Sequence, residues 1–265
     1  MGRRSPHNPA ALARRWKTLA RRAGLALRVL TEHDGYPVLA ITSPAWDRAE
    51  PGALYLSAGI HGDEPAGTEA LLEWAEAEGR ALRHLPLLIL PCLNPWGLQE
   101  NNRRDRSGRD LNREWRTSAH PLVGAVKSLL IGRRIALALT LHEDYDGQGF
   151  YLYEPTRFRA PDVWGERIVK RVGLILPPDP RRQIDGRAQT APGIIRRYLL
   201  SPERMAPEPE ALFLHYHVAD RTFTFETPSE FALEQRVAAQ IAAISAALQA
   251  SRQNPQRRPG IPSSN

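Results

Sequence analysis

Three short apolar runs limit what this chain can fold into, because each is long enough for one buried strand and far too short to cross a membrane. They occupy residues 53–60, 86–95 and 135–143, and helical patterns at 65–81 and 123–132 separate them. Strands that alternate with helices pack as a sheet between two helical layers. We therefore predict an α/β fold: a mixed, mostly parallel twisted sheet with helices on both faces.

Weaker patterns extend this arrangement toward both ends of the chain. We expect further strands at 25–32, 36–43, 149–154 and 221–228, and helices at 9–24 and 227–251. Thr227 and Glu230 have the spacing of a capping box, which favours a helix start at Thr227. Residues 1–251 would then form a single catalytic domain. Residues 252–265 are polar and rich in Pro and Gly, so we expect a disordered tail there.

Composition excludes several classes of protein. The 265 residues include 42% hydrophobic and 25% charged residues, which excludes wholesale disorder. The net charge of +7 comes mostly from Arg, but no basic patch is interleaved with aromatic residues at a recognisable spacing, so we predict no nucleic-acid partner. Cys92 is the only cysteine, which excludes an intramolecular disulfide. With no signal-peptide pattern and no membrane-spanning run, we expect a cytoplasmic protein without a membrane partner. The sequence leaves the oligomeric state open.

Chemically active residues stand where the apolar runs end. His61 and Glu64 lie three positions apart between the strand at 53–60 and the helix that follows, and His142 ends another strand. Imidazole nitrogen and carboxylate oxygen are zinc ligands, and catalytic zinc sites use three protein ligands and leave a position for water. A histidine at a strand end is also a common hydrogen-bonded edge residue, and a short motif can arise by chance. Together, however, the three residues match a hydrolytic His-Glu-His zinc site.

Longer motifs around these residues support a family resemblance. The stretch "GIHGDEPAG" resembles the HxxE zinc motif of the M14 zinc carboxypeptidases, nearest to the small bacterial branch beside murein-peptide amidases and the succinylglutamate desuccinylase/aspartoacylase group. The stretch "NPWGLQENNRRDRSGRDLNREW" resembles the NPDG and GxDLNR motifs of the family, and "TFTFETPSE" its last motif. Four motifs in order over residues 50 to 230 are far more specific than HxxE alone. The resemblance implies a zinc-carboxypeptidase-like fold with one zinc ion per chain.

The resemblance also assigns roles to individual residues. It implies that His142 is the third metal ligand beside His61 and Glu64. It implies that Asn112 and Arg113 bind the carboxylate of the substrate, a task that suits the bidentate guanidinium. A second arginine would stabilise the oxyanion of the transition state. Arg103 fits the family spacing best, and Arg104 and Arg106 are alternatives.

Glu226 corresponds to the catalytic glutamate of the family. It follows the alternating stretch "TFTF", so its side chain should lie on the side of the strand that Thr224 shares, opposite Phe225. As a general base it would take a proton from the metal-activated water and pass it to the leaving amine. Classical members also cover the substrate with a tyrosine, for which Tyr198 and Tyr216 are the candidates here.

The resemblance implies a zinc-dependent metallocarboxypeptidase that hydrolyses an amide bond next to a free carboxylate by metal-activated water. Its substrate would be a peptide or acyl-amino acid with a free carboxylate. An N-acyl-amino-acid deacylase or a murein-peptide amidase on the same site is the alternative. A non-catalytic binding module is the alternative of another class, and it would be expected to lack a metal ligand or Glu226. His215 and His217 form a rival histidine pair for a metal, without a carboxylate at a familiar spacing.

Overall fold

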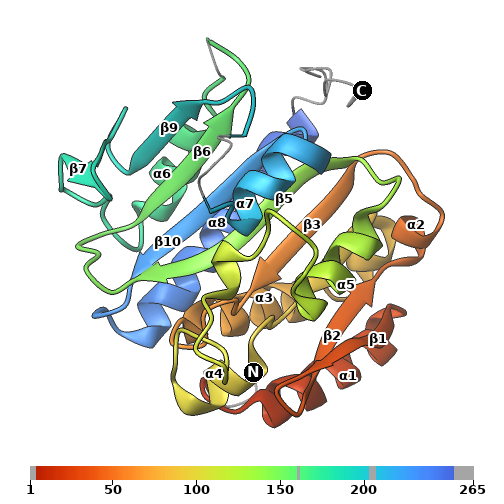
Figure 1. Ribbon diagram of the computed structural model, residues 1–265. Helices are drawn as coiled ribbons and strands as arrows, with labels where there is room; N and C mark the ends of the chain where they lie inside the picture. Colours follow the sequence, from red (N-terminus) through yellow and green to blue (C-terminus); the bar gives the residue numbers. More distant parts are fainter. Residues whose placement is uncertain (1–3, 160–161, 203–206, 254–265) are drawn as a thin grey trace.

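The computed structural model describes residues 4–159, 162–202 and 207–253 (Figure 1). Their central element is an eight-stranded twisted sheet of order β1-β2-β4-β3-β5-β10-β6-β9. Pairing is parallel between β3 and both of its neighbours, between β5 and β10, and between β6 and β9, and it is antiparallel elsewhere. The strands are β1 (Ala26–His33), β2 (Tyr36–Thr42), β3 (Ala53–Ala58), β4 (Leu87–Leu90), β5 (Ile135–Asp144), β6 (Tyr151–Thr156), β9 (Ile194–Tyr198) and β10 (Thr222–Pro228). A separate hairpin pairs β7 (Gln183–Ile184) with β8 (Arg187–Ala188).

Helices cover both faces of the sheet. The α-helices are α1 (Pro9–Ala23), α2 (Pro44–Asp47), α3 (Pro65–Glu78), α4 (Pro95–Glu100), α5 (Pro121–Leu130), α6 (Trp164–Val172), α7 (Glu210–Phe213) and α8 (Leu233–Gln253), and the other helical turns are η1 (Gly79–His84), η2 (Leu111–Arg113) and η3 (Leu214–Val218). The larger core joins one sheet face to α1, α3, α6 and α8, and a second core joins the other face to α5 and Trp46 of α2. In Figure 1, α5 and α7 lie in front of the sheet and α3, α6 and α8 lie behind it. The predicted α/β fold class is therefore confirmed.

The last helix differs from its prediction. Thr227 does not cap a helix, because β10 pairs with β5 as far as Pro228 and α8 begins only at Leu233. The Thr227 hydroxyl instead accepts a hydrogen bond from Gln240 Nε2 at 3.3 Å. Thr227 is paired in the sheet with Glu143 of β5, so it cannot also adopt the position of a helix cap. The helix continues to Gln253, so the first two residues of the predicted tail are helical, and the rest of the tail lies outside the described residues.

The burial of Cys92 and the character of the helices can be compared with the sequence. Cys92 is buried, as its apolar context indicates. Within the described ranges, no helix combines the length and the apolar character needed to cross a lipid bilayer.

Candidate active site

The turn between β3 and α3 places His61 and Glu64. Its backbone is held by the Gly62 N–H, which donates to the Asn102 carbonyl at 3.1 Å. Gly62 packs directly on Gly97, and a Cβ on Gly62 would lie 1.9 Å from the Gly97 carbonyl carbon. The glycines of the first two motifs therefore allow the β3–α3 turn and helix α4 to touch backbone to backbone. Glu64 then stands immediately before Pro65, the first residue of α3.

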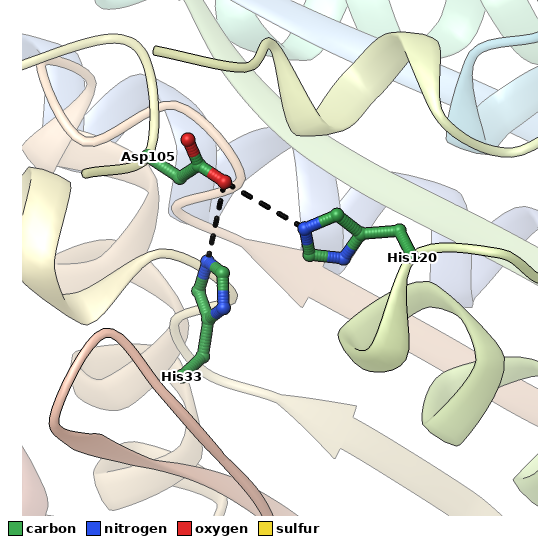
Figure 2. Close-up of side chains that lie close together, drawn as sticks. All are labelled: His33, Asp105 and His120. Atoms are coloured by element: carbon green, nitrogen blue, oxygen red, sulfur yellow. Dashed lines mark ion pairs between the residues drawn. The ribbon is translucent and has the colours of Figure 1, made fainter. Parts of the chain in front are cut away.

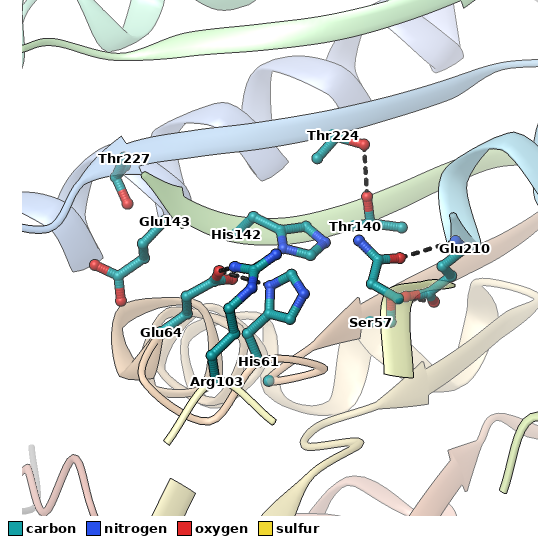
Figure 3. A network of polar contacts seen from close by, with 12 residues as sticks. Ser57, His61, Glu64, Arg103, Thr140, His142, Glu143, Glu210, Thr224 and Thr227 are labelled. Atoms are coloured by element: carbon teal, nitrogen blue, oxygen red, sulfur yellow. Dashed lines mark hydrogen bonds and ion pairs between the residues drawn. The ribbon is translucent and has the colours of Figure 1, made fainter. Parts of the chain in front are cut away.

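His61, Glu64 and His142 come together at the carboxyl ends of β3 and β5 (Figure 3). His61 Nδ1 lies 2.6 Å from Glu64 Oε1, and His142 Nδ1 lies 2.9 Å from Glu64 Oε2. All three side chains are buried, and one donor atom from each lies within 4.8 Å of the others. The three residues predicted from separate stretches of sequence thus form one compact donor set.

Asp110 supports this cluster from the loop before η2. His61 Nε2 lies 3.1 Å from Asp110 Oδ1. Histidines that bind metals usually donate their second ring N–H to a carboxylate, which fixes the tautomer and the ring orientation. Burial lowers the pKa of His61, but Glu64 and Asp110 outweigh it and raise that pKa to about 9. The sequence motif contained Asp110, but sequence reasoning gave it no role.

The chemistry of this donor set fits a zinc ion. Two imidazoles and one carboxylate are the ligands of many hydrolytic zinc sites. Burial would raise the pKa of Glu64, but His61 and His142 lower it below its ordinary value, so the carboxylate stays ionised. A buried anion between two imidazoles, with a second carboxylate behind one ring, provides a negative environment for a divalent cation.

Arg103 is the arginine that reaches the cluster. Its Nη1 lies 3.3 Å from Glu64 Oε1 and its Nη2 lies 3.3 Å from Asp110 Oδ2. Arg104 instead donates to the Gly108 carbonyl, and neither Arg104 nor Arg106 lines the cleft over the cluster. Of the three arginines that spacing left open, Arg103 alone lines the cleft.

A cleft of about 510 Å³ lies over the cluster, and one face of the sheet forms its floor. His142 on β5, Thr224 and Glu226 on β10, and Tyr151 and Tyr153 on β6 all line it. Phe225 points the other way, into the larger core, so the alternation predicted for this strand is correct. Alternation within paired strands therefore collects polar groups from distant parts of the chain on one surface.

Glu226 occupies an unusual electrostatic position in this cleft. Burial raises its pKa well above the ordinary value, and although His142 opposes the shift, the carboxylates of Glu64, Asp144 and Asp185 add to it. A carboxyl group with a raised pKa, close to a candidate metal ligand, is typical of a group that exchanges protons during catalysis.

Asn112 and Arg113 lie on η2 at the wall of the cleft. Asn112 is buried, and its Oδ1 accepts a hydrogen bond from the Glu210 N–H at 2.9 Å. Glu210 in turn accepts from the hydroxyls of Tyr55 and Ser57. Arg113 is exposed and donates to the Asn112 carbonyl at 3.1 Å. Asn112 thus fastens the wall to α7, while the Arg113 side chain lies at the solvent side.

The cleft also contains tyrosines that sequence reasoning missed. Tyr151 and Tyr153 donate to Asp144 and Asp185 at 3.0 and 2.7 Å. The alternation in "GFYLYE" could have indicated that they share one strand face. Tyr198 and Tyr216, the two predicted candidates, do not line the cleft.

Neither histidine of the rival pair belongs to a metal-binding group among the described residues. His215 and His217 lie on the helical turn η3. His215 Nε2 lies 3.0 Å from the Leu199 carbonyl, and His217 Nε2 lies 3.5 Å from Glu208.

Comparisons with known proteins place this geometry in context. The family model of the succinylglutamate desuccinylase/aspartoacylase catalytic domain matches residues 51–134. A candidate metallopeptidase from Shewanella baltica OS155 superposes with a TM-score of 0.80 at 24% identity, over 92% of this chain and 93% of the other. A candidate metallopeptidase from Shewanella amazonensis SB2B gives 0.79 at 23% identity, over 92% and 94%. A metallo-carboxypeptidase from Burkholderia cenocepacia gives 0.65 at 17% identity, over 91% and 68%. The chain has a carboxypeptidase-like fold.

The family match and the carboxypeptidase-like fold together confirm the resemblance seen in the motifs. The matched region contains His61, Glu64 and the stretch from Arg103 to Arg113, and it ends before His142. The catalytic-domain match supports a hydrolase. No curated protein is similar enough in sequence to count as a match.

Proposed function

We propose that this protein is a zinc-dependent metallocarboxypeptidase, which hydrolyses an amide bond next to a free carboxylate. The observation that carries the proposal is the joint placement of the His61–Glu64–His142 donor set and Glu226 on one cleft. When bound there, a zinc ion would act as a Lewis acid that activates water and polarises the scissile carbonyl.

Glu226 is the general base in this proposal. It lies beside His142 and is not one of the three clustered donors, so it is available to accept a proton from the attacking water. The pKa of Glu226 is raised, so its carboxyl group holds a proton more tightly than an ordinary carboxyl group does. It can therefore keep the proton taken from water until it passes it to the leaving amine. Glu226 is half-buried on the floor of the cleft, and its strand pairing with β5 and β6 holds its backbone in position.

Two arginines bind the charged parts of the substrate. Arg113 lies on the wall of the cleft, where its planar guanidinium can pair with the terminal carboxylate. Arg103 lies beside Glu64, where it can donate to the oxygen that becomes negative in the transition state. A substrate held by both arginines would present its scissile amide to the donor set.

An N-acyl-amino-acid deacylase is the second candidate, and the family match favours it. The cleft also contains Arg187 and Arg197 in addition to Arg103 and Arg113. Four arginines suit a substrate with more than one anionic group. The deacylase and the murein-peptide amidase would use the same donor set and the same Glu226.

The experiment is a substrate panel with the zinc-loaded protein. It compares blocked peptides that have a free C-terminal carboxylate, the same peptides with a C-terminal amide, and N-acylated single amino acids. We expect cleavage of the free peptides and little of the amides. Equal rates for both would contradict the proposal, and turnover of N-acylated amino acids in preference to every peptide would favour the deacylase.

A further inference from the structure

A second histidine and carboxylate cluster lies apart from the candidate active site. Among the described residues, His33, Asp105 and His120 are the other group whose donor atoms all lie within 4.8 Å of one another (Figure 2). His33 ends β1, Asp105 lies in the loop between α4 and η2, and His120 stands directly before α5. Three segments distant in sequence therefore meet through these side chains.

The spacing of the three groups is unlike that of a hydrogen-bonded cluster. Asp105 Oδ2 lies 3.8 Å from His33 Nε2 and 3.6 Å from His120 Nε2. Hydrogen bonds between nitrogen and oxygen are 2.7–3.2 Å long. Two donors that bind one zinc ion at 2.0–2.1 Å with tetrahedral angles lie about 3.3 Å apart. The observed separations are thus nearer to those of ligands around a shared ion.

One nitrogen of each imidazole in the cluster is buried without a hydrogen-bond partner. His33 Nε2, which faces Asp105 Oδ2, has no hydrogen-bond partner. The His120 side chain is only 4% exposed, and its other ring nitrogen, Nδ1, also lacks a partner. Buried polar groups are nearly always satisfied, so such atoms require an explanation. Asp105 Oδ1 accepts from Ser107 Oγ and the Arg109 N–H, each at 2.8 Å, and these bonds turn Oδ2 toward both imidazoles.

We propose that His33, Asp105 and His120 form a second, structural site for a divalent transition metal, with zinc as the expected ion. The donor set, two imidazoles and one carboxylate, suits zinc. Asp34 Oδ2, 3.5 Å from His33 Nε2, is the nearest further carboxylate. The competing explanation is a charged His33–Asp105 ion pair bridged to His120 by water, which predicts no bound metal.

The position of the cluster gives this site a structural task. Asp34 and Gly35 form the tight turn after His33, with φ of 52° and 84°, and Asp34 Oδ2 accepts the Arg106 N–H at 2.8 Å. The same loop carries Arg103 and Asp110, which contact Glu64 and His61. A metal at the second site would tie the β1–β2 turn and the start of α5 to the loop that borders the cleft.

The test is the zinc content of matched variants. Wild type, Asp105→Asn, His61→Ala and the double variant are stripped with a chelator and dialysed against zinc. Metal and protein are then measured on the same samples. Asn at position 105 keeps an oxygen for Ser107 and Arg109 and removes the anionic oxygen between the imidazoles. His84→Gln, at an exposed histidine on η1, is the control.

We expect Asp105→Asn and His61→Ala each to hold one zinc fewer than wild type, and the double variant to hold none. His84→Gln should match wild type. Zinc should also raise the melting temperature of His61→Ala but not of the double variant.

If Asp105→Asn fails to fold, the zinc content and melting temperature of His61→Ala alone decide the question. A His61→Ala protein without zinc would overturn the second site, and so would a folded Asp105→Asn protein with wild-type zinc content. Loss of zinc in Asp105→Asn but not in His61→Ala would support the second site while contradicting the proposed active-site ligands.

Discussion

Glu226 and His142 are direct neighbours in the sheet, as register partners on the parallel strands β10 and β5. The proposed general base and a proposed metal ligand therefore share a floor of paired backbone and do not depend on a mobile loop. Two residues earlier on each strand, the hydroxyls of Thr140 and Thr224 lie 2.8 Å apart, which repeats the side-by-side arrangement along the same face. The strand pairing thus fixes the spacing between these two residues.

Replacing His61 with Ala should remove the metal from the active-site cluster. The other two donors are too few for a catalytic zinc site, which uses three protein ligands. We expect zinc content to fall by one ion per chain while circular dichroism stays that of a folded protein, because this side chain belongs to neither core. Wild-type zinc content in His61→Ala would contradict the ligand assignment.

Arg103→Ala should lower kcat by about 10²- to 10³-fold, which is the usual effect of removing one donor to the oxyanion. The neighbouring Arg104→Ala is the matched control, since Arg104 donates to the Gly108 carbonyl outside the cleft. Steady-state kinetics on a free peptide, with zinc measured on each sample, checks this prediction. A wild-type kcat for Arg103→Ala would exclude it from the reaction.

Arg113→Ala should lower kcat/KM by about 10- to 100-fold, because a hydrogen bond to a charged group contributes about 1.5–3 kcal/mol. Arg113→Lys should recover little of this loss, since an ammonium group lacks the planar fork. The comparison uses peptides with a free C-terminal carboxylate. Full activity of Arg113→Ala on them would remove this residue from substrate binding.

Features of this architecture that depend on local sequence patterns could be predicted from the sequence. His61, Glu64 and His142 could be selected because each follows an apolar run that a sheet must bury. The side of Glu226 could be predicted because alternation with Phe225 is a property of the strand itself. The α/β fold followed from the alternation of strands and helices over most of the chain.

Other features depend on which segments become neighbours, and no local pattern specifies that. Tyr151 reaches the cleft because β6 pairs with β10, with Tyr151 opposite Glu226. The contact of Asp110 with His61 depends on how the loop after α4 folds back on the first motif. His33 and Asp105 likewise meet only through tertiary packing. Thr227 belonged both to the predicted strand at 221–228 and to the predicted helix at 227–251, and the pairing of β10 with β5 as far as Pro228 decided for the strand.

His215 makes stability depend on pH in a defined direction. It is 1% exposed, and burial lowers its pKa to about 4, although the hydrogen bond to the Leu199 carbonyl opposes the shift. The unfolded chain, with an ordinary histidine pKa of about 6.5, then binds more protons than the folded chain between these values, so stability falls as the pH drops from 6.5 toward 4.

At pH 5 this single group should cost about 2 kcal/mol of unfolding free energy relative to pH 7.5. His215→Gln keeps a donor for Leu199 and cannot titrate. The free energy of unfolding of wild type and of His215→Gln is measured in urea at both pH values. Between pH 7.5 and pH 5, wild type should lose more of this free energy than His215→Gln does, by the amount given above. An identical difference at both values would show that His215 titrates normally.

The most direct test of the account is the turnover of Glu226→Gln on a free-carboxylate peptide, with zinc content and melting temperature measured on the same sample. Gln preserves the shape of the side chain but cannot accept the proton of the attacking water. General acid–base catalysis contributes about 10²- to 10⁴-fold, so we predict a fall in kcat of that size, with unchanged zinc and little change in KM. Lost zinc would instead identify Glu226 as a ligand. A wild-type kcat at full zinc content would contradict the account.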